Sequence, residues 1–384
     1  MPIFTPSPLA LVLGTATAVF ILAGFSTKAS GDFKMKSVKI VGAGGYGGVG
    51  ITELILQHPE FKIGCLVAAT ETGMKMSDLY PHLNGFCDEL IRTPDDPKAQ
   101  EAYDAVFFST PDGVGMQAAA QELAKGAHVV DYSGDFRFTT PEKYSAYANF
   151  IGKNPVHTAP ELLPQTVYGL SELHPFGKKQ KLAGNPGCFA VSCILGLAPA
   201  VANKLINPKS VICDCKTGVS GAGKKPATTF HYPARYEQIN AYKLAGHQHM
   251  VEIEQELSAL AGETIRITMT AQVLPLCRGI LSCLYADLNE TLSATELMEV
   301  YKAFYADKPF VRIFDNKANI GTAQVSGTNF CNLIVDVDAR NNRLRIISHI
   351  DNLMKGQAGN ALQNMNLMFG FDPMLGLNFP GRCP

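Results

Sequence analysis

The chain has 384 residues and 46% of them are hydrophobic, which is enough for a sizeable core and excludes long-range disorder. Its 33 Lys and Arg residues are balanced by 34 Asp and Glu. The resulting net charge of −1 provides no basic excess to hold a nucleic acid, so a general nucleic-acid-binding protein is excluded. The length is typical of about two or three domains.

The N-terminal residues 1–36 differ from the rest of the chain. Residues 9–25 carry no charge, and such a run is near the lower length limit of a transmembrane helix. A soluble-enzyme pattern begins at Met35, so we prefer a misassigned start, place a membrane anchor second and a cleaved signal peptide third. We therefore exclude residues 1–36 from the fold and expect a cytoplasmic protein.

From residue 37, strand-like segments alternate with helical ones, which indicates βαβ units and a parallel sheet. The expected order is a strand at 38–42, a helix over 51–61, strands at 61–70 and 104–109, a helix over 116–126 and a strand from 128.

The pattern changes after residue 209, where β-rich, alternating segments predict a second sheet with its own helices. We therefore expect an α/β protein, with a Rossmann-type parallel-sheet domain followed by an α+β domain. The expected strands lie at 210–220, 265–276, 279–288, 331–339 and 344–351, with helices over 296–307 and 352–370.

Ten cysteines are scattered along the chain and none forms a CxxC pair, so we expect no metal site and no disulfide framework. Cys213 and Cys215 lie two apart on an expected strand, which places both side chains on one face. We interpret most of the cysteines as reduced core thiols.

A glycine-rich turn follows the first expected strand and matches GxGxxG. Without Cβ atoms such a turn lets a pyrophosphate approach the N–H groups at a helix N-terminus. The strand–turn–helix context favours a dinucleotide site over a flexible turn. The turn consists of Gly42, Ala43, Gly44, Gly45, Tyr46, Gly47 and Gly48.

The residues after the second strand bear on the ribose of that dinucleotide. An acidic side chain there favours an unphosphorylated ribose, and an arginine favours a 2′-phosphate. The chain has Thr70-Glu71, and no arginine follows until Arg92. Glu71 is either a ribose contact or a solvated loop charge, and the sequence leaves both interpretations open.

Cys188 precedes an apolar stretch of helical length, so we expect it at a helix N-terminus. The helix dipole and free N–H groups there lower a thiol pKa, and a thiolate attacks acyl carbons. A structural Cys188 is the alternative.

His247, His249 and Glu252 form an HxHxxE pattern on an expected helix. One histidine would move a proton for Cys188, while Glu252 would orient an imidazole ring. Taken singly, each histidine also suits a surface cap.

Lys224 follows the small-residue turn TGVSGAG, and Arg278 lies between two expected strands, in LPLCRGI. Both are candidate clamps for a phosphate or carboxylate, with ordinary surface charges as the alternative.

Taken together, these motifs resemble the N-acetyl-γ-glutamyl-phosphate reductase family of the semialdehyde dehydrogenase superfamily. The resemblance runs from about residue 37 to the C-terminal region. The motifs, in order, are VGAGGYGGVGITELILQHPEF (41–61), SDLYPHL (77–83), VVDYSGDFR (129–137), VYGLSEL (167–173), NPGCFA (185–190), TGVSGAGK (217–224), HQHMVEIEQEL (247–257), LPLCRGI (274–280) and NLMKGQAGNALQNMN (352–366).

The resemblance implies a division into a leader (1–36), a dinucleotide-binding domain (37–184), a catalytic and oligomerisation domain (185–350) and a C-terminal segment (351–384) that returns to the first domain. It implies Cys188 as the nucleophile and His247 as the proton donor, with Glu252 beside them. Implied cofactor residues beyond the glycine turn are Thr70, Ser109, Pro111 and Asn352, and implied substrate residues are Ser133, Arg137, Asn185, Ser220, Gly221, His249 and Arg278.

Three positions depart from the family pattern. Gln248 replaces the arginine of the usual HRH, Thr70-Glu71 replaces a Ser-Arg pair that holds the 2′-phosphate, and the turn reads GAGGYGG where the family has GxSGYTG. The resemblance implies NADP as the cofactor, and Glu71 leaves NAD as the alternative.

The implied reaction is the NADPH-dependent reduction of N-acetyl-L-glutamyl 5-phosphate to the 5-semialdehyde and inorganic phosphate, a step of arginine biosynthesis. A related aspartate- or N-acetylaminoadipate-semialdehyde dehydrogenase is one alternative, and a non-catalytic dinucleotide sensor is another. We expect a homo-oligomer, either a dimer or a tetramer.

Overall fold

The computed structural model describes residues 34–177 and 179–381, and its helices and strands lie within the unit Met35–Pro384. The apolar stretch at 9–25, and with it the question of a membrane tether, lies outside the described residues. Within the described ranges, no helix is long and apolar enough to cross a membrane.

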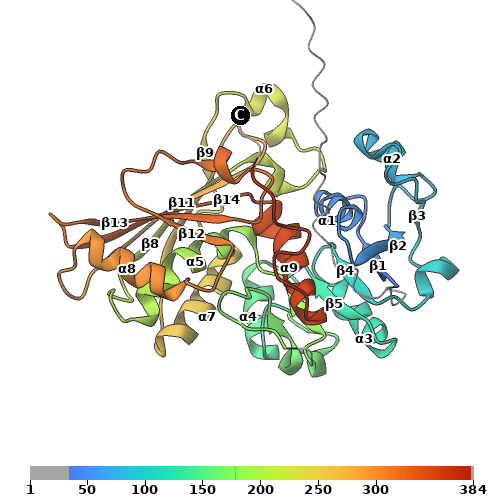
Figure 1. The fold of residues 1–384 in the computed structure, drawn as a ribbon, viewed down its shortest axis with the longest axis horizontal. Coiled ribbons are helices and arrows are strands. Elements are labelled where there is room, and N and C mark those ends of the chain that lie inside the picture. The colour runs from blue at the N-terminus through green and yellow to red at the C-terminus, as the bar shows by residue number, and fades with distance from the viewer. Residues whose placement is uncertain (1–33, 178, 382–384) are drawn as a thin grey trace, which may run out of the picture. The chain divides into compact units, whose positions relative to one another are not determined.

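A seven-stranded sheet forms the first half of this unit, and every neighbouring pair of its strands is parallel. This confirms the predicted parallel sheet. Its order is β3-β2-β1-β4-β5-β7-β6. Figure 1 labels β3, β2, β1, β4 and β5, which follow one another from right to left. The strands are β1 (Lys36–Val41), β2 (Phe61–Val67), β3 (Ile91–Arg92), β4 (Ala105–Phe108), β5 (His128–Asp131), β6 (Val167–Tyr168) and β7 (Leu182–Gly184).

Helices cover both faces of this sheet. Its buried residues accordingly divide into two apolar clusters, one on each face. One cluster includes residues of α1 and α9, and the other includes residues of α3 and α4. The bounds are α1 (Tyr46–Leu56), α2 (Met76–Leu79), α3 (Gly115–Ala124), α4 (Pro141–Phe150) and α9 (Gly359–Phe369).

The helix predicted over 51–61 is shifted toward the N-terminus. It begins at Tyr46, inside the glycine turn, and ends at Leu56. Pro59 accounts for the early end, since a residue before proline disfavours the helical region. The residues between Leu56 and Phe61, which were predicted to be helical, instead connect α1 to β2.

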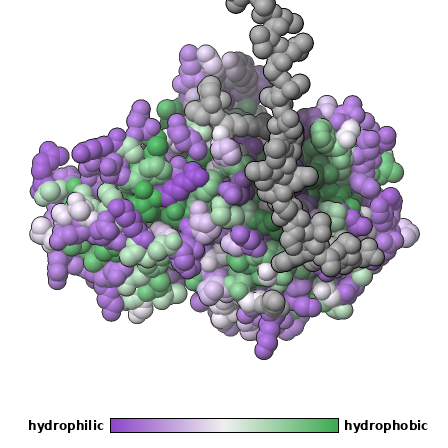
Figure 2. Space-filling model, in the orientation of Figure 1, coloured by the Kyte–Doolittle hydropathy of each residue, from purple (hydrophilic) through white to green (hydrophobic). Residues whose placement is uncertain are grey.

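A second seven-stranded sheet follows, in the order β12-β13-β14-β11-β8-β10-β9, with both parallel and antiparallel pairs. This confirms the predicted second sheet. Its edge strands are β12 and β9. At the far left of Figure 2, where Figure 1 draws α8 (Ala294–Phe304), hydrophilic side chains are interspersed with hydrophobic ones. The strands are β8 (Val211–Thr217), β9 (Asn240–Tyr242), β10 (Ile267–Val273), β11 (Ile280–Asp287), β12 (Val311–Phe314), β13 (Cys331–Asp338) and β14 (Arg343–Ile350).

The core of the second half lies between this sheet and α5, α7 and α8. Burial alternates along β8, and Cys213 and Cys215 point into the core as predicted from their spacing. The nine described cysteines are all free thiols. The helices are α5 (Cys188–Ala202), the short α6 (Tyr232–Arg235), α7 (His249–Ala261) and α8 (Ala294–Phe304).

The helix predicted over 352–370 is divided in two. A π-helical turn spans Met354–Ala358, and α9 continues from Gly359. Although α9 follows the last strand of the second sheet, it contacts α1 and β5 of the first. This packing supports a C-terminal segment that returns to the first sheet, while the domain boundaries themselves stay a prediction.

Candidate active site

The glycine turn joins β1 to α1 through a very close backbone approach. A Cβ on Gly42, whose φ is 86°, would lie 2.2 Å from the Ser109 carbonyl oxygen, and one on Gly48 would lie 2.3 Å from the Gly42 oxygen. Helix α1 has neither a side-chain cap nor an acidic residue in its first turn. Its first N–H groups are therefore left to an anion, so the turn fits a dinucleotide pyrophosphate.

The turn and the start of α5 line one cavity of about 350 Å³, although they belong to different halves of the unit. The structure thus brings together residues that the sequence analysis drew from six separate motifs. The predicted site residues on its wall are Gly45, Tyr46, Gly47, Ser109, Pro111, Arg137, Asn185, Cys188, Ser220, Gly221, His249 and Asn352.

Cys188 is the first residue of α5, as predicted, and it lines a second and larger cavity as well. Its thiol is partly accessible, yet burial raises the pKa of Cys188 to about 11. The predicted lowering of this pKa is therefore wrong for the free protein. Desolvation by the surrounding protein outweighs the helix N-terminus, which stabilises the thiolate.

His247 and His249 are buried beside Cys188, so the surface interpretation is wrong. Their rings lie 4.7 Å apart, and His247 Nδ1 accepts a hydrogen bond of 3.2 Å from the His249 backbone N–H. His249 opens α7, whereas His247 precedes the helix. The His249 ring packs against Gly187, where a Cβ would lie 2.2 Å from Nε2.

Burial lowers the pKa of both histidines, that of His247 to about 4. Both imidazoles are therefore neutral at physiological pH. Because Nδ1 of His247 accepts a hydrogen bond, the neutral ring carries its proton on Nε2. His249 borders both cavities, while His247 borders the larger one.

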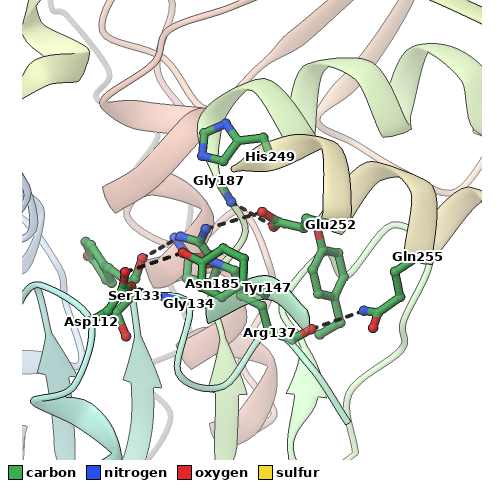
Figure 3. A network of polar contacts seen from close by, with 12 residues as sticks. Asp112, Ser133, Gly134, Arg137, Tyr147, Asn185, Gly187, His249, Glu252 and Gln255 are labelled. Atoms are coloured by element: carbon green, nitrogen blue, oxygen red, sulfur yellow. Dashed lines mark hydrogen bonds and ion pairs between the residues drawn. The ribbon is translucent and has the colours of Figure 1, made fainter. Parts of the chain in front are cut away.

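Glu252 does not orient a histidine ring, and this part of the prediction is wrong. Its Oε1 accepts hydrogen bonds from the Gly187 N–H at 2.9 Å and the Tyr168 hydroxyl at 2.7 Å. Its Oε2 accepts from Arg137 Nη1 at 3.2 Å (Figure 3). Burial raises the pKa of Glu252. The carboxylate thus fixes the backbone just before Cys188.

Arg137 and Asn185 reinforce the same corner from the first sheet. Arg137 donates from Nε to the Asn185 carbonyl oxygen at 2.7 Å. The Asn185 side chain bonds to Asn360 Nδ2 at 2.8 Å and to the Gln357 carbonyl oxygen at 3.1 Å. Both residues border the smaller cavity, but their polar atoms mainly hold the segment that leads to Cys188.

The two predicted anion clamps are already paired. Arg278 forms an ion pair of 3.0 Å with Asp351, and Lys224 forms one of 2.8 Å with Glu71. Both side chains are about one-third exposed, so the alternative of ordinary surface charges stays open for each. Their partners lie 73 and 153 positions away in the sequence, which explains why the local motifs did not indicate them.

Two further predicted ligands have internal partners. The Asn352 amide donates to Ser220 Oγ at 3.0 Å and accepts from the Gly279 N–H at 2.8 Å, so it ties two turns together. Ser133 donates its hydroxyl to Asp131. The predicted site residues that border neither of the two cavities are Gly42, Ala43, Gly44, Gly48, Thr70, Ser133, Glu252 and Arg278.

The larger cavity has a volume of about 770 Å³ and extends from Cys188 along the second sheet. Its wall includes both histidines and two cations that the sequence analysis did not single out, Arg235 and Lys243. Arg235 is the last residue of α6 and Lys243 follows β9, so both precede the HQH motif in the sequence, and that position was the available signal. Arg235 donates to the Val273 carbonyl oxygen at 3.1 Å and Lys243 to Gln248 Oε1 at 2.6 Å, so both cations already hold internal acceptors. Both give positive charge to the wall of this cavity.

Family comparisons agree with this geometry. Residues 37–180 match the model described as semialdehyde dehydrogenase, NAD binding domain, and residues 188–352 match the one described as semialdehyde dehydrogenase, dimerisation domain. The N-acetyl-gamma-glutamyl-phosphate reductase of Acetivibrio thermocellus is 40% identical over 352 residues, covering 90% of this chain and 99% of the relative. That of Moorella thermoacetica is 39% identical over 350 residues, covering 90% and 99%.

The chain belongs to the N-acetyl-γ-glutamyl-phosphate reductase family. Family membership makes it an oxidoreductase with a nicotinamide dinucleotide cofactor, and the reductase relatives support NADP. The predicted family, enzyme class and cofactor are thereby confirmed, and the non-catalytic sensor is set aside. The dimerisation domain supports a homo-oligomer.

Solved structures with the same fold are aspartate-semialdehyde dehydrogenases. A probable one from Pseudomonas aeruginosa has a TM-score of 0.63 at 18% identity, covering 88% of this chain and 99% of that one. One from Candida albicans with NADP has a TM-score of 0.60 at 14% identity, covering 88% and 99%. Identities this low carry the fold alone.

Proposed function

We propose that Cys188 catalyses the reduction of N-acetyl-L-glutamyl 5-phosphate to the 5-semialdehyde and inorganic phosphate, within arginine biosynthesis. The observation that carries this proposal is the position of Cys188. It lies where the cavity at the glycine turn meets the larger cavity with its two cations and two histidines. A thiol that takes up an acyl group needs a dinucleotide on one side and its substrate on the other.

The first step is acylation of Cys188. The thiol, with its pKa near 11, loses its proton to a neutral imidazole as sulfur attacks the acyl carbon and phosphate leaves. We assign this proton to His249, whose ring packs against Gly187. The reduced dinucleotide, when bound, supplies the hydride for the thioester.

The second proton goes from His247 to the substrate oxygen as the thioester is reduced to a thiohemiacetal. The aldehyde leaves when the C–S bond breaks, with the hydroxyl proton returning to His247 and the proton held by His249 returning to the sulfur. His247 suits this role because its neutral ring carries the proton on Nε2 and borders the larger cavity. Glu252 and Arg137 act as positioning residues, since they hold the Gly187 N–H and the Asn185 carbonyl next to the nucleophile. In this assignment His249 acts on the thiol rather than as a substrate ligand alone.

The division of labour is tested by single turnover with acyl phosphate. His247→Asn should still release phosphate at about the wild-type rate but oxidise NADPH ~100-fold more slowly. His249→Asn should slow phosphate release itself. Equal slowing of both steps in both variants would contradict the assignment.

The acyl chain is tested in the reverse direction with the full chain. NADP and phosphate are mixed with N-acetylglutamate semialdehyde, aspartate semialdehyde or N-acetylaminoadipate semialdehyde, with Cys188→Ser as the control. Phosphate-dependent reduction of NADP by the first substrate is expected. Turnover with another semialdehyde in its place would move the protein to that branch of the superfamily.

Two observations support the compartment and the oligomeric state that we propose for the enzyme. The nine described cysteines are free, which supports a reducing compartment, and we infer the cytoplasm. The match to a dimerisation domain supports a dimer or a tetramer. Size-exclusion chromatography with light scattering distinguishes these assemblies from a monomer.

A further inference from the structure

An ion pair between two loops joins the two halves of the unit beside the glycine turn. Glu71 lies in the loop after β2, and Lys224 follows the short 3₁₀ turn Val219–Ala222 that comes after β8. Lys224 Nζ lies 2.8 Å from Glu71 Oε1. The contact is part of neither sheet, and each partner belongs to a motif of the proposed site.

The pair lies directly beside the turn that fits the pyrophosphate. A Cβ on Gly44 would lie 2.8 Å from Glu71 Oε2, and the Tyr80 hydroxyl donates to the Gly44 carbonyl oxygen at 2.9 Å. Lys224 Nζ lies 5.6 Å from the centre of the Tyr80 ring. In doubly wound sheets the group after the second strand meets the ribose of a dinucleotide. Glu71 and Lys224 together occupy that position.

The charges at this position explain how an acidic residue and NADP coexist. An unpaired carboxylate after the second strand repels a 2′-phosphate. Here Thr70 and Lys224 both hydrogen-bond Glu71, and the Lys224 side chain is about 30% exposed. The Lys224 ammonium group is partly accessible and already lies at this position. It can therefore release the Glu71 carboxylate and bind a phosphate there without a large movement.

We propose that Lys224, delivered from the second half of the unit, recognises the 2′-phosphate of NADP by exchanging its partner Glu71 for the phosphate. Selection of the phosphorylated cofactor then depends on both halves of the protein. Glu71 competes with the phosphate for the same ammonium group, and its removal favours NADP. A lysine from the second half of the unit thus takes the role of the arginine that the family resemblance leads us to expect after β2.

The test measures binding rather than turnover, so it does not depend on the acyl substrate. Calorimetry of the full chain compares 2′,5′-ADP, which carries the 2′-phosphate, with 5′-AMP, which lacks it. Lys224→Ala should weaken binding of 2′,5′-ADP by about 10- to 100-fold and leave 5′-AMP nearly unchanged, as expected for a charge-assisted hydrogen bond. Glu71→Gln should strengthen binding of 2′,5′-ADP.

Lys225→Ala is the matched control, because it removes the neighbouring positive charge and leaves the Glu71 pair in place. Its effect on 2′,5′-ADP should be less than about threefold, as expected for a screened surface charge. Thermal unfolding of each variant confirms that the fold is intact. The proposal is overturned if Lys224→Ala weakens both nucleotides equally, if Lys225→Ala weakens 2′,5′-ADP as much, or if Glu71→Gln weakens it.

Discussion

At Cys188 two effects of opposite sign act on one thiol. The N-terminus of α5 favours the thiolate, whereas burial favours the neutral form and raises the pKa to about 11. The free enzyme thus holds its nucleophile as a thiol beside neutral imidazoles. An activated thiolate is then formed during the reaction and not before it.

Alkylation by iodoacetamide tests this protonation state. Cys277 is exposed, whereas Cys188 is only partly accessible, so Cys277 should react first at pH 7. The rate at Cys188 should then rise about tenfold per pH unit toward its pKa near 11. Peptide mapping by mass spectrometry follows both sites, with Cys277→Ser as the control. If Cys188 reacts faster than Cys277 at pH 7, and its rate does not change between pH 6 and 8, the thiolate is already formed in the free enzyme.

The Glu252 carboxylate holds the backbone just before Cys188 in place through its hydrogen bond to the Gly187 N–H. Glu252→Gln keeps the size of the side chain but leaves the buried Arg137 without its negative partner, and we expect a loss of about 3 kcal/mol or more in the free energy of unfolding. Tyr168→Phe removes one hydrogen bond to the same carboxylate and should cost about 1 kcal/mol. Urea unfolding measures both. Equal losses would mean that the charge of Glu252 contributes nothing beyond a hydrogen bond.

At the scale of the element, the glycine turn shows which glycines the geometry requires. A Cβ on Gly48 would lie 2.3 Å from a backbone oxygen, whereas one on Gly45 would make an ordinary contact at 3.6 Å. Gly48→Ala should therefore destabilise the protein by about 1–3 kcal/mol and weaken dinucleotide binding. Gly45→Ala should change stability by less than about 0.5 kcal/mol. Thermal unfolding and calorimetry with NADP distinguish the two, and a reversed order would refute the close approach.

The same scale shows what local sequence can and cannot predict. Both sheets and the strand–turn–helix at Gly42 were predictable, because hydrophobic periodicity and glycine placement act within about ten residues. The start of α1 inside the glycine turn and the π-helical turn at Met354 were not, because tertiary packing decides where a helix begins and how it is wound. The position of Cys188 at a helix start was predictable, but its burial was not.

For the whole molecule, the sequence analysis named several site residues but missed their pairings, because the partners are distant in the chain. Glu252 contacts Arg137 from 115 positions away, and Arg278 contacts Asp351 from 73. No local pattern encodes such pairs. The motif that contains Lys355 was recognised, yet its structural role became visible only with the fold.

Lys355 connects the C-terminal segment to the rest of the site. Its side chain is fully buried and its Nζ lies 2.6 Å from Glu172 Oε1. It also donates to Gln363 at 2.8 Å and Asn360 at 3.2 Å, and Asn360 in turn contacts Asn185. The ion pair therefore fixes the start of the last helix against the segment that leads to the nucleophile.

Removing this lysine should destabilise the protein in a pH-dependent way. Lys355→Met leaves Glu172 buried and unpaired, with an expected loss of about 3–5 kcal/mol at pH 7. In the native protein burial alone would raise the pKa of Glu172, but Lys355 and the Gln363 amide together with the backbone outweigh it and the pKa is lowered. The ionised Glu172 therefore stabilises the folded protein fully when the pH is above 4.5, the ordinary pKa of a glutamate. This stabilisation declines as the pH falls below that value. In the variant the unpaired carboxyl takes up a proton on acidification and its penalty disappears.

The difference in unfolding free energy between native protein and Lys355→Met should therefore shrink as the pH is lowered from 7 to 4. Lys355→Met combined with Glu172→Leu removes both charges and should recover most of the loss at pH 7, apart from about 1–2 kcal/mol for the amides left without a partner. Denaturant unfolding at several pH values measures each variant. A loss that is independent of pH, or a double variant no more stable than the single one, would mean that Lys355 acts through packing and not through its charge.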